Sequence, residues 1–400
     1  MRVAHFCKYF SPLSETFIYD AITELERQGL DNHVVTRIRA QPEERPFEKT
    51  YVVDGPHRFH PRRLWHRALA QFGIGKFGKD EKNWTRWPVL RTRMKKILRQ
   101  IAPDVIHAQF GPAGVLIGPV ARALNVPLLV TFHGADITKL AEEDRWRRAY
   151  QSLFPQADAL LGVSSHICKR MTALGAPAHK VKEFHLGTQI DQFDYRERPS
   201  NSKGPVQCLH VGRLVEKKAP LLLVEAFRQA QERAANKGVE LRLSIAGDGS
   251  LRSELERCIQ ESGLTDSVDV LGAVPHERVV ELMREADIYT QHSVTAADGN
   301  QEGLPIGLIE ATATGLPVVS TWHSGIPDLV MHDETGLLVE ERNVEAMGRC
   351  IAELAADPER RRAMGRAGRR RVEEHFDLSK QMRKLAGIYE DVCSKKSRNT

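Results

Sequence analysis

No run of apolar residues in the sequence is long enough to cross a membrane. The longest, such as Ala159–Val163 and Leu221–Val224, fall far below the roughly 18 to 20 residues that a bilayer requires. The N-terminus also lacks the apolar stretch and small-residue cleavage site of a secretory signal, because it enters a strand-like run at once, at Arg2–Phe6. We therefore expect the chain to stay in the cytosol.

Cysteine motifs and compositional bias are absent as well. The six cysteines are scattered, without a C-x-x-C pair or a histidine at zinc-ligand spacing, and are expected to be buried, reduced thiols. The composition of 41% apolar and 28% charged residues excludes a disordered or low-complexity chain. Because a single core stops growing well before 400 residues, we expect at least two domains with a cleft between them.

Positive charge is concentrated in one segment, although the net charge of +6 is mild for the whole chain. Residues 57–100 contain thirteen Lys and Arg residues against only Asp80 and Glu81, with Trp and Phe interleaved. Cations beside aromatic anchors suit the headgroup region of an anionic membrane. An ordinary solvated helix face explains the segment equally well, and nucleic acid, which the same charge would attract, is not expected as a partner.

Short apolar runs typical of buried strands alternate with helical patterns, which predicts doubly wound parallel sheets with both faces covered. In the first half the expected strands are Val3–Phe6, His33–Thr36, Asp104–Gln109, Pro127–Phe132, Asp158–Ser164 and Val181–His185, with helices at Glu15–Gln28 and Ala113–Leu124. In the second half the expected strands are Val206–Val211, Leu241–Ala246, Val268–Leu271, Asp287–Gln291, Pro317–Thr321 and Gly336–Val339.

A polar, turn-rich stretch at Tyr195–Pro205 interrupts this alternation and marks the domain boundary. We therefore predict an N-terminal α/β domain over 1–198, a second α/β domain over 199–375 and a closing segment over 376–400. The helix-rich end of the chain contains two arginine triplets, Arg360–Arg362 and Arg369–Arg371, which we expect to be solvated.

Two loops of the second half have residues suited to an anionic ligand. Gly212 follows a predicted strand and lets the backbone approach a ligand closely. Arg213 and Lys218 can converge on one anion, such as a diphosphate. The segment Asn300–Glu310 opens a helix near Pro305, whose free N–H groups attract phosphate. In that segment Gly303 and Gly307 have no side chains and leave room for a ligand. Glu302 and Glu310 could accept hydrogen bonds from sugar hydroxyls.

These residues resemble the large family of retaining glycosyltransferases with the two-Rossmann GT-B fold, family 4. The resemblance lies in Val-Gly-Arg-x4-Lys from Val211 to Lys218 and Glu-x7-Glu from Glu302 to Glu310, and extends over about 206–376. Further matching segments are Ala246–Gly249, Leu271–Val274, Gly315–Thr321 and Gly325–Val330. The resemblance implies that the C-terminal helix packs back toward the N-terminal domain.

The N-terminal half is similar, more loosely, to the branch that builds colanic acid and related bacterial exopolysaccharides. The similarity lies in Phe10–Ile18, His107–Phe110, Thr131–Asp136 and Gly162–Ser164. Relatives often have a Gly-Gly pair in the first loop, where this chain has Leu13-Ser14-Glu15, and Ser14 could also be a plain helix N-cap.

The resemblance implies a donor site and a mechanism. Arg213 and Lys218 would hold the diphosphate of a UDP- or GDP-sugar, Glu310 the ribose, Glu302 a sugar hydroxyl, and His133 would lie near that sugar. The remaining implied residues are Gly212, Gly247, Gly303, Leu304 and Pro305 for donor binding, and Ser14, Glu15, His107 and Asp136 for acceptor binding or loop support. The acceptor would be a polysaccharide or a polyprenyl-linked saccharide, and the enzyme would lie in the cytoplasm or at the inner face of the plasma membrane.

We expect transfer without a cofactor or a metal, because cations and a helix N-terminus can stabilise the leaving diphosphate. The absence of a D-x-D motif agrees with this expectation.

Two other functions are compatible with parts of the sequence. Gly247–Gly249 partly imitates a dinucleotide fingerprint, but Arg252 occupies the place of its third glycine, which disfavours an NAD-dependent oxidoreductase. A non-catalytic sugar-binding protein would not need Arg213 and Lys218 together with both glutamates.

Overall fold

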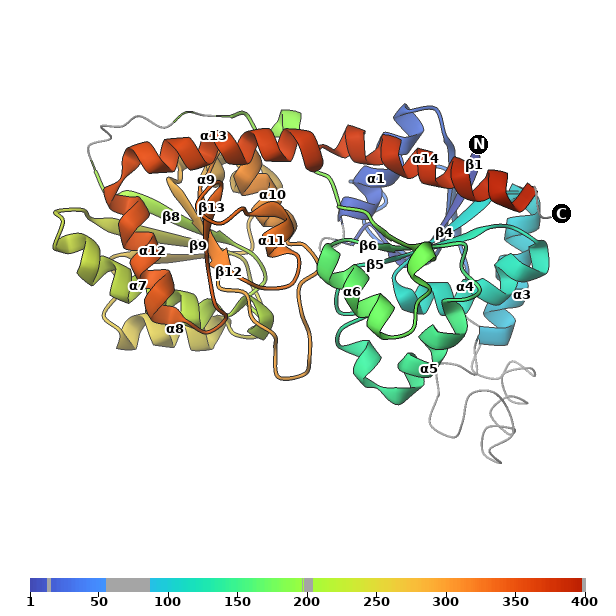
Figure 1. Ribbon diagram of the computed structural model, residues 1–400, viewed down its shortest axis with the longest axis horizontal. Helices are drawn as coiled ribbons and strands as arrows, with labels where there is room; N and C mark the ends of the chain where they lie inside the picture. Colours follow the sequence, from blue (N-terminus) through green and yellow to red (C-terminus); the bar gives the residue numbers. More distant parts are fainter. Residues whose placement is uncertain (13–15, 55–86, 196, 198–203, 398–400) are drawn as a thin grey trace.

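The computed structural model describes residues 1–12, 16–54, 87–195, 197 and 204–397. Its strands form two separate parallel sheets, one from each half of the chain (Figure 1). The sequence analysis therefore identified the doubly wound α/β class correctly. The first sheet ends at Glu183 and the second begins at Val206, so the polar stretch at 195–205 lies between them.

The N-terminal sheet has the strand order β3-β2-β1-β4-β5-β6-β7. Its strands are β1 (Arg2–Phe10), β2 (Asp31–Arg39), β3 (Thr50–Val52), β4 (Val105–Gln109), β5 (Leu128–Phe132), β6 (Ala159–Gly162) and β7 (Val181–Glu183). The helices of this domain are α1 (Thr16–Arg27), α3 (Trp87–Ile101), α4 (Gly111–Leu124), α5 (Asp144–Leu153) and α6 (Ser165–Ala173). Strands β4, β5 and β6 are buried along their whole length, which explains their continuous apolar sequence.

The C-terminal sheet has the strand order β10-β9-β8-β11-β12-β13. Its strands are β8 (Val206–Val211), β9 (Leu241–Ala246), β10 (Val268–Gly272), β11 (Ile288–Thr290), β12 (Val318–Thr321) and β13 (Gly336–Val339). The helices are α7 (Pro220–Ala235), α8 (Arg252–Glu261), α9 (His276–Glu285), α10 (Ile306–Ala313), α11 (Ile326–Leu329), α12 (Val344–Ala356) and α13 (Pro358–His375).

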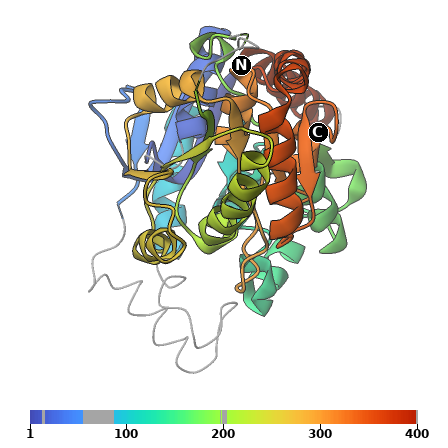
Figure 2. The same cartoon turned by 90° about the vertical axis from the view of Figure 1, so that its left-hand side faces the viewer.

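Adjacent residues of each strand in this sheet pack into different cores, because side chains alternate across a strand. Cys208 and Val319 belong to the core under α7 and α12, whereas Leu209 and Val318 belong to the core under α9 and α10. Figure 2 looks at this domain from its outer side and shows α7 and α12 lying side by side. Helices therefore cover both faces of the sheet.

The chain crosses between the domains a second time just before α14 (Leu378–Ser397), which lies along the N-terminal domain while α13 lies along the C-terminal one (Figure 1). The two crossings touch, since Thr188 N–H donates to Phe376 O at 2.9 Å and Leu378 N–H donates to Thr188 O at 3.0 Å. A Cβ on Gly187 would lie 2.5 Å from Leu378 Cα, so only glycine fits there. We call this contact between the two crossings the hinge.

Helix α14 is anchored in the N-terminal domain by an apolar face and one buried polar pair. Leu378, Met382 and Leu385 share a core with strand residues such as Val3 and Leu161. Within that packing, Tyr389 Oη lies 2.7 Å from His107 Nδ1, and His107 Nε2 lies 2.7 Å from Thr131 Oγ1. The resemblance implied that the last helix returns to this domain, and the fold confirms it.

Some details differ from the sequence expectations. Strand β3 was not predicted, because three residues at a sheet edge give no periodic signal. The arginine triplets are not uniformly solvated: Arg361 donates to Leu354 O and Ala355 O, Arg369 to Phe193 O and Ala313 O, and Arg371 to Asp328 O and Leu329 O. Backbone carbonyls that lack partners recruit these guanidinium groups. None of the six cysteines forms a disulfide, but only Cys7 and Cys208 are fully buried.

None of the helices in the described part of the chain is long and apolar enough to cross a bilayer.

We predict that Tyr389→Phe lowers the free energy of unfolding by about 1–3 kcal/mol, because it leaves the buried Nδ1 of His107 without its partner. Urea titration measures the change. Tyr9→Phe is the matched control, since Tyr9 is exposed and its hydroxyl makes no hydrogen bond with the described residues. An equal effect of the two substitutions would contradict the anchoring role of Tyr389.

Candidate active site

The carboxyl ends of the strands in both sheets point toward loops that meet between the domains. Ligands of open parallel sheets bind where the strand order reverses. In the C-terminal sheet that point lies between β8 and β11, and in the N-terminal sheet between β1 and β4. The loops that follow these strands contain most of the residues singled out from the sequence.

Glycines let the loops after β8 and β9 pack backbone against backbone. Gly212 N–H donates to Ala246 O at 3.0 Å, and Leu214 N–H donates to Asp248 O at 3.0 Å. A Cβ on Gly247, whose φ is +149°, would lie 1.9 Å from Gly212 O. Gly247 therefore serves this packing, which is a different use from the pyrophosphate contact of a dinucleotide fingerprint.

Lys217 and Lys218 end a 3₁₀ turn (Glu216–Lys218) after β8 and pair with one carboxylate, Glu302. Lys218 Nζ lies 3.3 Å from Glu302 Oε1, and Lys217 Nζ lies 3.4 Å from Oε2. The three residues are only 8%, 9% and 7% exposed. Lys218 also donates to Gln291 Oε1 at 3.4 Å. We call these three residues the Lys-Glu-Lys cluster.

Burial and mutual charge set the ionisation of the cluster. Burial alone would raise the pKa of Glu302, but the charges of Lys218 and Lys217 outweigh it and lower that pKa to about 2. Burial lowers the pKa of Lys218. The charges of Lys217 and Arg213 lower this pKa further, whereas the charge of Glu302 raises it. With both lysines protonated, the cluster has a net positive charge that suits an anion.

The backbone of Glu302 is held by a chain of hydrogen bonds from the next strand. Glu302 N–H donates to His323 Nε2 at 3.1 Å, so the other ring nitrogen, Nδ1, bears the proton and faces Glu341 Oε1 at 2.5 Å. Thr295 N–H donates to the second oxygen of Glu341 at 2.8 Å. This network fixes the loop that precedes α10.

Two charged groups beside the cluster are free to bind a ligand. Arg213 is exposed, and its guanidinium makes no hydrogen bond or ion pair with the described residues. Glu310 projects from α10 without a hydrogen-bond partner among those residues. Burial, together with the charge of Asp20 on α1, raises the pKa of Glu310 to about 7. Leu304 and Pro305, which directly precede α10, are buried.

His133 reaches the same place from the N-terminal domain. A Cβ on Gly303 would lie 2.0 Å from His133 O, and one on Gly134, whose φ is +139°, would lie 2.9 Å from Gly303 N. The ring of His133 lies between Phe17 and Phe110, and its Nε2 is 2.9 Å from Gln109 Oε1. Burial lowers the pKa of His133 to about 3, so the ring is neutral at neutral pH. Its Nδ1 has no hydrogen-bond partner among the residues that the structure describes.

Two of the N-terminal candidates lie in the framework around this loop. Asp136 accepts hydrogen bonds from the backbone N–H groups of Gly111, His133 and Gly134 at 2.9 to 3.0 Å, which shapes the turn that presents His133. His107 lies one strand away in the interior, between Thr131 and Tyr389. Ser14 and Glu15 lie outside the described residues.

Three contributors to the site had no assigned role in the sequence analysis. Lys217 is adjacent to Lys218, but the side chains of sequence neighbours usually diverge, and the 3₁₀ turn brings both to Glu302. Gln291 follows β11 directly, and His323 lies two residues after the end of β12. Their positions at strand ends are the one signal that could have identified them.

The sequence of the whole chain matches known enzymes. Residues 191–371 match the family model described as Glycosyl transferases group 1, and residues 14–192 match the one described as Glycosyltransferase Family 4. AmsK of Erwinia amylovora, an amylovoran biosynthesis glycosyltransferase, is 29% identical over 98% of this chain and 100% of its own length. WcaL of Escherichia coli K12, a glycosyltransferase assigned to colanic acid biosynthesis, is 30% identical over 97% and 99%.

The fold also matches solved structures. The crystal structure of Anabaena HepE in complex with UDP superposes with a TM-score of 0.75 over 98% of this chain and 100% of that one, at 17% identity. Fold and site thus define a glycosyltransferase of the GT-B class. The chain belongs to the family of Glycosyl transferases group 1, as the resemblance had indicated. The oxidoreductase and sugar-binding alternatives find no support.

We predict that stability falls as the pH rises between about 4.5, the ordinary pKa of a glutamate, and about 7, the pKa of Glu310 in the fold. Over this range the folded protein holds a proton that the unfolded chain releases, so deprotonation favours unfolding. Glu310→Gln removes the titrating group and should flatten this part of the pH profile, as measured by urea titrations. Glu277→Gln, at an exposed position, is the control. Parallel profiles for wild type and Glu310→Gln would contradict the assignment.

Proposed function

We propose that this glycosyltransferase moves a sugar from a UDP- or GDP-sugar to a bacterial cell-surface polysaccharide or its polyprenyl-linked precursor, with UDP or GDP as the leaving group. The observation that supports this most strongly is the buried, net positive Lys-Glu-Lys cluster, with Arg213 and Glu310 unpaired beside it at the switch point of the C-terminal sheet. Likeness to AmsK and WcaL supports the acceptor class, and the UDP complex of HepE supports a nucleotide-linked donor.

In this proposal Arg213 and Lys218 bind the donor diphosphate. The contacts of Lys218 Nζ to Glu302 and Gln291, at 3.3 and 3.4 Å, are longer than the 2.7 to 2.9 Å typical of strong charge-assisted hydrogen bonds, so the ammonium can turn toward phosphate at little cost. Lys217 then continues to neutralise Glu302, which keeps that carboxylate ionised and able to accept from a sugar hydroxyl. Glu310 accepts from the ribose hydroxyls.

Bond cleavage builds negative charge on the leaving diphosphate, and the two cations stabilise that charge without a metal ion. The reaction retains the anomeric configuration: the acceptor hydroxyl attacks from the face that the diphosphate leaves and gives its proton to a leaving phosphate oxygen. His133, neutral and with Nδ1 unpaired, positions the transferred sugar and does not act as an acid. Closure of the two domains excludes water and limits hydrolysis of the donor.

We predict that Arg213→Ala and Lys218→Ala each lower turnover by at least about 10²-fold, because each removes a donor that stabilises developing charge. The assay is nucleotide release from a panel of UDP- and GDP-sugars, after a thermal-shift screen has identified the nucleotide that binds. Lys237→Ala, at an exposed lysine at the end of α7, is the control. Unchanged turnover in both test variants would overturn the diphosphate role.

A peripheral membrane location at the inner face of the plasma membrane follows from the polyprenyl-linked acceptor. Most of the basic segment at 57–100 lies outside the described residues, but its last part forms α3. There Arg91 donates to Val115 O and Leu116 O of α4 and is structural, whereas Lys96 and Arg99 are exposed. The exposed cations of α3 continue the charge of the segment and support contact with anionic headgroups.

We predict that neutralising Arg62, Arg63, Arg67, Lys95 and Lys96 together releases the protein from vesicles that contain anionic lipid, because each basic residue near such a surface contributes about 1 kcal/mol. Vesicle co-sedimentation at low and high salt measures binding, with purely zwitterionic vesicles as the control. Equal binding before and after substitution would show that the segment is ordinary surface.

A further inference from the structure

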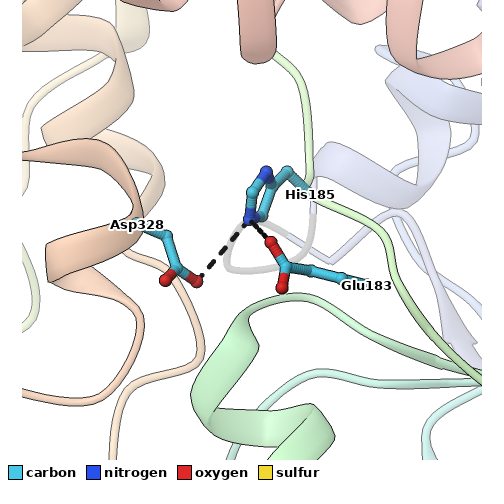
Figure 3. Close-up of side chains that lie close together, drawn as sticks. All are labelled: Glu183, His185 and Asp328. Carbon is cyan, nitrogen blue, oxygen red and sulfur yellow. Dashed lines mark ion pairs between the residues drawn. The ribbon is translucent and has the colours of Figure 1, made fainter.

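Three side chains with metal-ligating atoms meet beside the hinge. Glu183 at the end of β7 and His185 just after it belong to the N-terminal domain, and Asp328 belongs to α11 of the C-terminal domain (Figure 3). His185 Nε2 lies 2.9 Å from Glu183 Oε1 and 3.6 Å from Asp328 Oδ2. One ligand atom from each residue lies within 4.8 Å of those from the other two.

His185 Nε2 faces a carboxylate oxygen from each domain. The atom is inaccessible to solvent and lies within ion-pair distance of both Glu183 Oε1 and Asp328 Oδ2. One ring nitrogen and two carboxylate oxygens that converge in this way form a ligand set that a shared cation can use.

Neighbouring groups hold the ligands in place. Asp328 accepts from Ser165 N–H at 2.7 Å through Oδ2 and from Ser165 Oγ at 2.6 Å through Oδ1. The ring of His185 stacks on Phe376, with centroids 4.9 Å apart and an interplanar angle of 26°. Such outer contacts orient the ligands of metal sites and are often as important as the ligands themselves.

We propose that Glu183, His185 and Asp328 bind one Zn²⁺ ion that joins the two domains at the hinge. Bonds of about 2.0 to 2.2 Å to nitrogen and oxygen in a tetrahedron place ligand atoms about 3.3 to 3.6 Å apart, close to the 2.9 and 3.6 Å observed. One imidazole with two carboxylates suits Zn²⁺ better than Mg²⁺ or Ca²⁺, which prefer all-oxygen sites.

The surroundings allow the ion to enter and balance its charge. Glu183 and His185 line an open groove of about 720 Å³, which can supply the water for the fourth position. Two carboxylates and a neutral imidazole together neutralise Zn²⁺. Arg371 is the nearby cation of α13, and its guanidinium is already bound to the carbonyls of Asp328 and Leu329. Lys182 and Lys384 also line the groove, so the ligands must bind Zn²⁺ strongly enough to overcome the repulsion from these two cations.

The ion acts on domain geometry and takes no part in sugar transfer. Its ligands come from both domains next to the point where Thr188 and Asp377 pair, so bound Zn²⁺ restricts rotation about the two crossings. A ligand that binds only the folded, closed arrangement raises its stability in proportion to the logarithm of the ligand concentration over Kd.

Calorimetric titration of the chelator-stripped protein with Zn²⁺ tests the proposal, together with Co²⁺ titration followed by visible absorption. We expect one strong site, a tetrahedral Co²⁺ spectrum and a rise in melting temperature with Zn²⁺. Glu183→Gln, His185→Gln and Asp328→Asn should each weaken binding at least about 10-fold. His179→Gln, at an exposed histidine outside the cluster, should bind like wild type.

Several results would overturn the proposal: no Zn²⁺ binding by the stripped wild type, equal binding by His185→Gln and wild type, or an octahedral Co²⁺ spectrum. Because Glu183 is exposed, Glu183→Gln should fold normally. This variant therefore still tests the proposal if the other two variants fail to fold. A chelator should lower the melting temperature without abolishing transfer. Loss of transfer on chelation, restored by Mg²⁺, would contradict the metal-free mechanism and leave the Zn²⁺ binding result unaffected.

Discussion

Two buried lysines share one buried carboxylate, and the rest of the site is organised around this imbalance of charge. Burying an ion costs several kcal/mol even after the protein relaxes. Glu302 compensates one lysine and leaves a net positive charge in a place that solvent scarcely reaches. Such an arrangement is costly in the empty protein and is offset when an anion binds. Under the proposed function, the same residues connect the stability of the loops to the binding of the donor diphosphate.

The fold supplies what this cluster requires. Parallel strands deliver the loops after β8, β11 and β12 to one edge, and the reversal of strand order between β8 and β11 leaves room there. The close contact of Gly247 with Gly212 O compacts the two loops, and His323 fixes the backbone of Glu302 from a third. Because each loop is held by its neighbour, Lys217 and Lys218 stay buried and their side chains do not turn out into solvent.

The strands could be predicted from the sequence because parallel sheets covered on both faces need uninterrupted apolar runs, as in β4, β5 and β6. The motif residues Arg213, Lys218, Glu302 and Glu310 were recognised individually, but only Lys218 and Glu302 touch one another in the structure. Lys217 and His323 were assigned no role because their part depends on a 3₁₀ turn and on a contact between distant loops. The expectation that the arginine triplets are solvated was wrong for Arg361, Arg369 and Arg371 for a related reason. A charge pattern predicts solvation, but these side chains donate to backbone carbonyls of other segments, whose positions only the fold reveals.

The two domains touch at the cleft and again at the hinge, and the two contacts constrain each other. At the cleft, the backbones of the two loops approach so closely that only glycine fits at positions 134 and 303. At the hinge, Ser165 binds Asp328 three residues after Gly325, and Gly325 N–H in turn donates to Gly303 O. A continuous path of backbone and side-chain contacts therefore runs from the cluster of Glu183, His185 and Asp328 to the loop that bears Glu302.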